Sequence, residues 1–136
     1  MRITREQMLM EIAFTVAKRG TCGRLQVGAV IARDSRVISM GYVGPPSGEP
    51  HCEEFGCDLT KPCRRTIHAE RNAIEFAWRQ ELPIKGADMF CTDSPCPICT
   101  ELLLYAGIAR LYFRRPYRVF DHLRNLDQLK VIHLVD

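Results

Sequence analysis

Two cysteines lie three residues apart in the segment Pro-Cys-Pro-Ile-Cys, a spacing typical of metal ligands. Cys96 and Cys99 lead into a leucine-rich run that is expected to be helical. We expect Ser94 to cap this helix and Pro95 to be its first residue, because the N–H that proline lacks would be unpaired there. Both sulfurs would lie in the first turn, where the helix dipole and free N–H groups lower thiol pKa values. The pair could bind a metal as thiolates, act as a redox pair, or be structural.

The segment Thr-Ile-His-Ala-Glu offers a third ligand and a carboxylate. His68 and Glu70 flank Ala69 where a second helix is expected to begin, with Thr66 as a possible cap. Residues two apart on a regular helix point about 200° away from each other. The two side chains can therefore face one point only if His68 sits at an irregular helix entry and Glu70 in the first turn. His-x-Glu followed by Pro-Cys-x-x-Cys matches the signature of zinc-dependent deaminases.

This combination predicts hydrolysis at a zinc ion. Catalytic zinc takes three protein ligands, here His68, Cys96 and Cys99, and leaves one position for water. Two thiolates cancel the formal charge of the ion, so the water stays less acidic than at a site with neutral ligands. Glu70 would therefore take the proton of the water. It would deliver that proton to a ring nitrogen beside an amine-bearing carbon and assist the release of ammonia.

The elements that must position these residues predict a layered α/β domain. Helical periodicity covers residues 3–19, with Thr4 as N-cap and Gly20 as the stop. Strands are expected at residues 25–32, 36–42, 87–92, 108–114 and 130–135, and further helices at 67–80, 96–106 and 121–126. Helices between strands favour a mixed or parallel sheet with helices on its faces. We expect one domain over residues 1–136.

Composition agrees with a globular enzyme. The 136 residues are 46% hydrophobic and 26% charged, and the net charge of +3 suits an anionic substrate without requiring nucleic acid. Charges interrupt the first twenty residues, and no apolar run approaches the roughly 18 residues of a membrane span. We therefore expect no leader, no membrane partner and a cytoplasmic location. Seven cysteines in such a chain favour metal binding or catalysis over disulfides.

Six segments carry a family resemblance over most of the chain. They are TCGRLQVGAVI, GYVGPPSG, PHCEEFGC, CRRTIHAERNAI, CTDSPCPIC and AGIARLYFRRPY. In these segments and their order the chain resembles the deoxycytidylate (dCMP) deaminases of the cytidine-deaminase-like superfamily. The resemblance implies a three-layer α/β/α fold with a central five-stranded mixed sheet, and zinc-dependent hydrolysis of dCMP to dUMP and ammonia, which supplies the dTMP precursor. It also implies a homo-oligomer, usually a hexamer, activated by dCTP and inhibited by dTTP.

The resemblance also implies contacts with the nucleotide. The backbone N–H of Ala69 would meet the pyrimidine carbonyl, and the carbonyl of Ser94 would accept from the amine. Arg24 and Tyr117 occupy the positions that hold the phosphate. The alternatives are that Arg24 is a solvated loop charge and Tyr117 a half-buried aromatic residue.

Arg79 is another candidate for phosphate or effector binding. By helical geometry it lies about 180° around the helix from Glu70. We therefore expect it to pair with Glu75, four residues earlier, or to reach a neighbouring subunit.

The remaining cysteines surround the long loop at residues 43–66. Some members of the family carry a structural zinc there, with ligands at the positions of Cys22 and Cys52. Cys57 and Cys63 would complete a tetrahedral site that holds the loop in place. His51 is a competing ligand, and buried free thiols are the alternative. Cys91, in the middle of an expected strand, is assigned to the core.

One loop departs from the family pattern. Gly-Tyr-Asn-Gly becomes Gly-Tyr-Val-Gly, so Val43 cannot make the contact of the asparagine with a sugar hydroxyl. Since an apolar group selects a hydroxyl less strongly, another cytosine nucleotide, a modified base or a non-nucleotide stays open as substrate. A nucleic-acid deaminase is disfavoured because the sequence has no clear basic stripe. A non-catalytic zinc module is disfavoured because it would have no use for the unligated Glu70.

Overall fold

The computed structural model describes residues 1–21, 25–44, 67–116, 121–123 and 126–135. Its elements, in chain order, are α1 (Arg5–Ala17), β1 (Gly28–Arg33), β2 (Arg36–Tyr42), α3 (Ala69–Arg79), β3 (Asp88–Asp93), α4 (Pro97–Ala106), β4 (Arg110–Arg115), the 3-10 turn η1 (Asp121–Leu123) and β5 (Lys130–His133). The described strands form one five-stranded sheet in the order β2-β1-β3-β4-β5. Strand β1 pairs antiparallel with β2 and with β3, whereas β4 pairs parallel with β3 and with β5, so the sheet is mixed.

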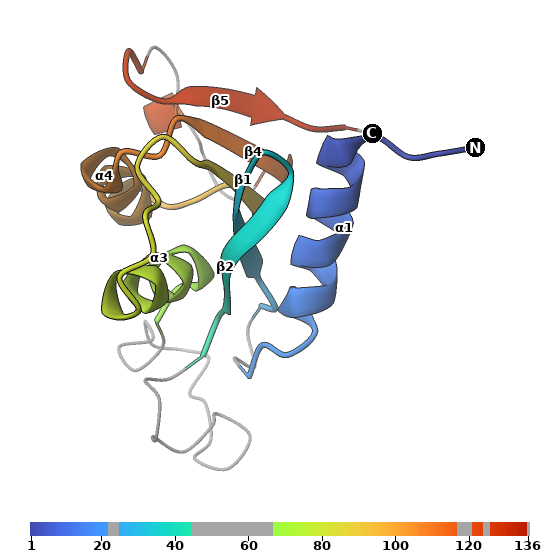
Figure 1. Cartoon of the computed structure of the whole chain (residues 1–136), viewed down its shortest axis with the longest axis horizontal. Helices are drawn as coiled ribbons and strands as arrows, with labels where there is room; N and C mark the ends of the chain where they lie inside the picture. The colour runs from blue at the N-terminus through green and yellow to red at the C-terminus, as the bar shows by residue number, and fades with distance from the viewer. Residues whose placement is uncertain (22–24, 45–66, 117–120, 124–125, 136) are drawn as a thin grey trace.

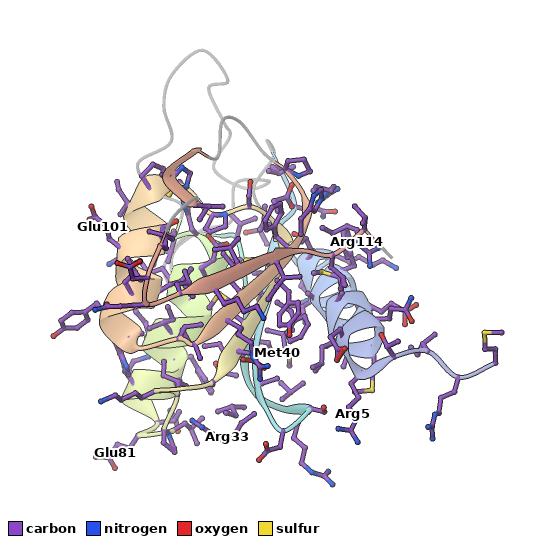
Figure 2. The ribbon with its side chains drawn as sticks, turned by 90° about the horizontal axis from the view of Figure 1, so that it is seen from above. Arg5, Arg33, Met40, Glu81, Glu101 and Arg114 are labelled. Atoms are coloured by element: carbon purple, nitrogen blue, oxygen red, sulfur yellow. The ribbon has the colours of Figure 1, made fainter. Side chains whose placement is uncertain are left out.

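Alternate side chains of the sheet pack into two hydrophobic layers. In β1, Ala29 and Ile31 join the core beneath α3 and α4, whereas Val30 and Ala32 join the core beneath α1. Figures 1 and 2 show α1 on one face of the sheet and α3 with α4 on the other; Glu101 marks the outer side of α4 in Figure 2. The predicted three-layer α/β/α fold is confirmed.

Helix α1 begins as its sequence predicts. The Thr4 hydroxyl accepts from the backbone N–H of Gln7 at 3.0 Å, and the Gln7 side chain accepts from the backbone N–H of Thr4 at 2.9 Å. This reciprocal capping box satisfies two N–H groups. The helix ends at Ala17, short of Gly20. Among the described helices, none is long and apolar enough to cross a membrane.

The expected strands are all present, with shifted ends. Strand β1 begins at Gly28 rather than at residue 25. At Gly28 the chain passes so close to α1 that a Cβ there would lie 2.2 Å from the carbonyl oxygen of Ala13. The pairing of β1 with β2 has a register shift between Ile31 and Ala32. The helix expected at residues 121–126 is a 3-10 turn where the structure describes it.

Close packing on β2 fixes the first turn of α3. A Cβ on Gly41 would lie 2.6 Å from the backbone nitrogen of Ala73. The Ser39 hydroxyl donates to the carbonyl of Ala73 at 2.8 Å, and Nδ2 of Asn72 donates to the carbonyl of Tyr42 at 2.7 Å. The start of α3 is therefore held against the sheet by contacts that a longer side chain at position 41 would disrupt.

Candidate active site

His68, Cys96 and Cys99 bring one nitrogen and two sulfurs together between α3 and α4. Nδ1 of His68 lies 3.2 Å from Sγ of Cys99 and 3.6 Å from Sγ of Cys96. All three ligand atoms lie within 4.8 Å of one another. Ligands bound tetrahedrally at about 2.0–2.3 Å from zinc lie about 3.5 Å apart. The spacing and the donor set therefore fit a zinc ion, and within the part of the chain that the structure describes no other such group occurs.

Helix α4 begins later than expected. Its N-cap is Cys96, with extended backbone (φ −71°, ψ 167°), and Pro97 is its first residue. Sγ of Cys96 accepts from the backbone N–H of Cys99 at 3.4 Å. The expectation that Ser94 caps the helix and Pro95 begins it is wrong. Pro97 disfavours helical backbone at the preceding Cys96, so Cys96 can be the cap but not an interior residue, and the helix starts at Pro97.

The two thiols influence each other's acidity. Hydrogen bonds from Cys99 and His68 lower the pKa of the half-buried Cys96. The hydrogen bond to Cys96 and burial raise the pKa of Cys99. Zinc binds cysteine as the thiolate, so metal binding would displace any proton that the pair holds.

Helix α3 has the irregular entry that a shared site requires. His68 is its N-cap, with extended backbone (φ −67°, ψ 153°), and Ala69 is its first residue, so Glu70 lies in the first turn. The His68 side chain is exposed, whereas Ala69 and Glu70 are buried. Thr66, the expected cap, lies outside the described residues. This change of backbone direction lets both side chains face the same region.

Glu70 is a buried carboxyl group beside the three ligands. Burial raises its pKa, while contacts with the thiols of Cys91 and Cys99 and the charge of His68 oppose that shift. Burial and the negative charge of Glu70 raise the pKa of Cys91 well above its usual range, so Cys91 contacts the carboxylate as a neutral thiol. A raised pKa suits a carboxylate that must both accept and release a proton. The sequence pattern predicts Cys91 as a core residue, which it is, but does not indicate this contact.

The other predicted site residues divide into two sets. Ala69 and Ser94 are buried beside the ligands, 0% and 5% exposed, but the nucleotide contacts assigned to them stay predictions. The remaining candidates lie outside the described residues, so their roles stay predictions too: Arg24, Tyr117, Cys22, Cys52, Cys57 and Cys63.

The expected pairing of Arg79 with Glu75 is wrong. Glu75 forms its ion pair with Arg71, with Nε and Oε2 3.2 Å apart. Both arginines lie four residues from Glu75, so spacing alone could not choose between them.

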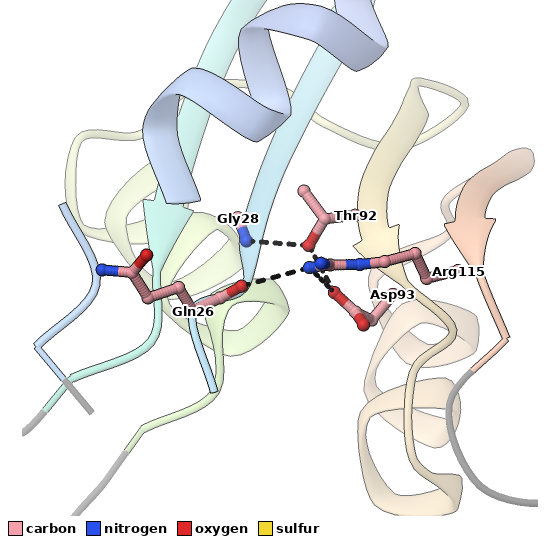
Figure 3. A network of polar contacts seen from close by, with 5 residues as sticks. All are labelled: Gln26, Gly28, Thr92, Asp93 and Arg115. Carbon is pink, nitrogen blue, oxygen red and sulfur yellow. Dashed lines mark hydrogen bonds and ion pairs between the residues drawn. The ribbon is translucent and has the colours of Figure 1, made fainter. Parts of the chain in front are cut away.

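A polar network at the ends of β3 and β4, with Thr92 and Asp93 buried and Arg115 exposed, was not predicted (Figure 3). Nη2 of Arg115 donates to Oδ1 of Asp93 at 2.8 Å and to the carbonyl of Gln26 at 3.3 Å. The Thr92 hydroxyl donates to Oδ1 of Asp93 at 2.7 Å and accepts from the backbone N–H of Gly28 at 3.2 Å. Arg115 and Gln26 are 89 residues apart, so no local pattern indicates their contact.

Comparison with known proteins agrees with this geometry. Residues 3–115 match the family described as the cytidine and deoxycytidylate deaminase zinc-binding region. The chain belongs to this family, in its dCMP deaminase branch.

Two curated relatives match over most of this chain. This chain is 39% identical over 126 residues to ComE operon protein 2 of Bacillus subtilis (strain 168). The match covers 92% of this chain and 67% of the relative. This chain is also 31% identical over 138 residues to the deoxycytidylate deaminase of Schizosaccharomyces pombe. That match covers 95% of this chain but only 42% of the yeast enzyme. The chain thus spans less than half the length of the yeast relative.

A solved structure has the same fold over its whole length. It is the dCMP deaminase from the cyanophage S-TIM5 in complex with dCMP and dUMP, with a TM-score of 0.87 and 28% identity. The match covers 98% of this chain and 99% of the phage chain.

Proposed function

We propose that this chain is a zinc-dependent hydrolase that converts dCMP to dUMP and ammonia. The observation that carries this proposal is the buried carboxyl group of Glu70 beside the three-ligand group of His68, Cys96 and Cys99. A structural zinc site is closed by four ligands and has no role for a further buried carboxylate, whereas a catalytic site has three ligands. The likeness to deoxycytidylate deaminases supports dCMP as the substrate.

Each residue of the site has a defined task in this reaction. His68, Cys96 and Cys99 would hold zinc, which supplies an acidified water molecule when bound. Glu70 accepts a proton from the attacking water and donates it to the ring nitrogen beside the amine-bearing carbon. It then helps to protonate the amine that leaves as ammonia. Its raised pKa lets Glu70 hold the proton between these transfers.

Backbone groups of the two helix starts would orient the base. Ala69 is the first residue of α3, so its N–H is among those without an intrahelical partner and suits the pyrimidine carbonyl. The carbonyl of Ser94, just before the β3–α4 turn, would accept from the amine. Arg24 and Tyr117 would hold the phosphate.

The same resemblance supports a second zinc and effector control. Cys22, Cys52, Cys57 and Cys63 would form a structural zinc site that stabilises the loop, with dCTP as activator and dTTP as inhibitor. Two zinc ions per active chain are expected, and Cys57→Ser should lose one of them with a larger effect on stability than on chemistry. A count of one zinc in fully active protein would remove this second site.

Exposed aromatic residues support the proposed homo-oligomer. Trp78 on α3 and Tyr105 on α4 are 42% and 83% exposed, and their rings meet edge to face with centroids 6.1 Å apart. Exposed aromatic residues are enriched at protein interfaces. We propose a hexamer in the cytoplasm that acts on a small nucleotide. Light scattering of the wild-type chain, with and without dCTP, tests the oligomer.

A substrate panel tests the reaction. Ammonia release would be measured with dCMP, dCTP, deoxycytidine and a tRNA substrate, each with wild-type protein and Glu70→Gln. Release from dCMP by the wild-type protein alone is expected. Release from tRNA only would assign the chain to nucleic-acid deamination, and no release from any compound at full zinc content would favour a binding module.

A further inference from the structure

We propose that Arg115 is a positioning residue that acts through Asp93 to hold Ser94 in place for the substrate, an inference that rests on the proposed function. Arg115 is the last residue of β4 and Asp93 the last residue of β3, and the two are paired in the parallel register. Ser94 follows Asp93 directly and is 5% exposed. The side chain and the backbone of Arg115 both act on this peptide segment.

Arg115 contacts the segment at two points. Its Nη2 donates to Oδ1 of Asp93 at 2.8 Å, and its carbonyl accepts from the backbone N–H of Ser94 at 3.0 Å. The Asp93 side chain is 7% exposed and that of Arg115 is 47% exposed. A carboxylate buried to this extent needs a charged partner, so removal of the guanidinium would drive it to reorient. The adjoining Ser94 carbonyl would move with it.

The geometry of Asp93 is fixed from a second side. The Thr92 hydroxyl donates to the same Oδ1 at 2.7 Å and is itself oriented by the backbone N–H of Gly28 at 3.2 Å. Thr92 is fully buried. With two donors on one oxygen, the carboxylate has one orientation; with the neutral donor alone, its charge is poorly compensated.

Arg115 also connects this segment to the approach of β1. It donates to the carbonyl of Gln26 at 3.3 Å, and Nε2 of Gln26 donates to the carbonyl of Gly20 at 3.3 Å. Cζ of Arg115 lies 5.1 Å from the ring centroid of Phe14 on α1, within the range of a cation–π contact. Figure 3 shows the guanidinium reaching from β4 toward both Asp93 and Gln26.

The metal ligands depend on other contacts. Cys96 is held as the N-cap of α4 by the backbone N–H of Cys99. The intervening Pro95 carbonyl accepts from Nε2 of His122 at 2.9 Å. Loss of Arg115 should therefore displace Ser94 while zinc stays bound. Since dCMP has an amine for the Ser94 carbonyl and dUMP has none, turnover of dCMP should suffer more than binding of dUMP.

The test compares Arg115→Gln with Arg114→Gln. Arg114 is the neighbouring arginine, and its Nε donates to the carbonyl of Leu134 instead, so its variant removes equal charge away from Asp93. We expect kcat/KM for dCMP to fall at least about tenfold in Arg115→Gln, since small displacements of positioning groups can cost up to about 100-fold. Zinc content and dUMP affinity of Arg115→Gln should stay within about twofold of wild type. In Arg114→Gln, kcat/KM for dCMP, zinc content and dUMP affinity should all stay within about twofold of wild type. Loss of zinc in step with activity would overturn the inference.

A double variant tests the route through Asp93. If Arg115 acts through this carboxylate, Asp93→Asn combined with Arg115→Gln should lose no more activity than the worse single variant, because coupled positions are not additive. Fully additive losses would overturn the route. Should Arg115→Gln not fold, Arg115→Lys replaces it. The lysine ammonium group cannot reproduce the planar hydrogen bonds of the guanidinium to Asp93 and Gln26, so an intermediate loss of kcat/KM is expected.

Amide hydrogen exchange separates this inference from the proposed function. Exchange of the Ser94 amide should accelerate in Arg115→Gln and stay unchanged in Arg114→Gln, whatever the substrate. If the wild-type protein did not deaminate dCMP, the proposed function would fall. An unchanged Ser94 exchange rate, or a kcat/KM equal to that of Arg114→Gln, would overturn the positioning role of Arg115 instead.

Discussion

The sulfur of Cys96 accepts a hydrogen bond from the backbone N–H of Cys99 at 3.4 Å, so the first ligand of the Cys pair caps the helix that carries the second. The same atom therefore belongs to the helix start and to the metal site. A serine at this position keeps an acceptor for the cap but loses the thiolate, which makes the two roles separable by substitution.

Cys96→Ser and Cys96→Ala should both lose zinc and activity, because the site needs its thiolate. In excess chelator, the serine variant should be more stable than the alanine variant by about 1 kcal/mol, the usual contribution of an N-cap side chain. Urea unfolding and zinc analysis provide the two measurements. Equal stabilities would contradict the capping role, and full zinc content in the serine variant would contradict the ligand role.

Glu70→Gln should retain zinc but lose activity by about 100- to 10,000-fold, the usual contribution of general acid–base catalysis. The amide preserves the shape of the side chain and cannot carry the proton. Ammonia release and zinc content would be measured on the same sample. Glu75→Gln, on the same helix and paired with Arg71, is the matched control and should remain active. Substantial activity in Glu70→Gln would show that another group moves the proton.

Gly41→Ala should destabilise the fold by about 1–3 kcal/mol, the usual cost of overpacking. The added Cβ would lie 2.6 Å from both the Ala69 carbonyl oxygen and the Ala73 nitrogen, which are backbone atoms. Because α3 would have to move, activity should fall as well. In Gly44→Ala the close atom is the Thr21 hydroxyl oxygen at 2.8 Å, a side-chain atom that can turn away. Thermal unfolding should therefore separate the two variants, and equal melting temperatures would contradict the close approach.

Val43→Asn should raise the preference for dCMP over an analogue that lacks the sugar hydroxyl by about tenfold, because one additional hydrogen bond can provide that much. Val43 is 7% exposed, so a polar side chain there must find a partner. The kcat/KM ratio of dCMP to its 3′-deoxy analogue is the measurement. Val43→Thr keeps the shape with a shorter polar group and should change the ratio less. An unchanged ratio in Val43→Asn would show that position 43 does not contact the sugar.

Tyr112→Phe should make the protein less sensitive to alkali. Burial raises the pKa of Tyr112 from its ordinary 10.0, and its ring stacks on Phe90 with centroids 4.3 Å apart. A raised pKa means that the folded chain keeps a proton that the unfolded chain releases. The resulting stability is complete below pH 10 and is lost as pH rises through the folded-state pKa. Unfolding free energies measured across this range should fall less steeply for Tyr112→Phe than for Tyr105→Phe, an exposed control; parallel curves would contradict the prediction.

The sequence predicted those parts of the fold that depend on local patterns. Thr4 as the N-cap of α1 and the existence of the strands follow from spacing and residue type. The start of α4 was misplaced although its cause is local: Pro97 disfavours helical backbone at Cys96, so Cys96 cannot lie inside a helix that begins at Pro95. Weighing the second proline would have placed Cys96 at the cap.

The rest of the site depends on contacts between distant segments. Asp93 and Arg115 meet because β3 and β4 are parallel neighbours in one register, and no periodicity encodes that register. Cys91 has an ordinary core pattern, and its position beside Glu70 appears only when α3 packs on the sheet. By contrast, His68, Cys96 and Cys99 were found from sequence because zinc chemistry limits both ligand type and spacing.

The register shift between β1 and β2 changes the outer edge of the sheet. Strand β2 is the outer described strand on its side of the sheet, and an unpaired edge can recruit a strand from another molecule. The shift at Ile31 and Ala32 interrupts the regular spacing that such a strand would need, and Arg33 and Arg36 add repelling charge at the turn. Regularising this edge by deleting the extra residue would be expected to favour pairing of β2 with a strand of another molecule.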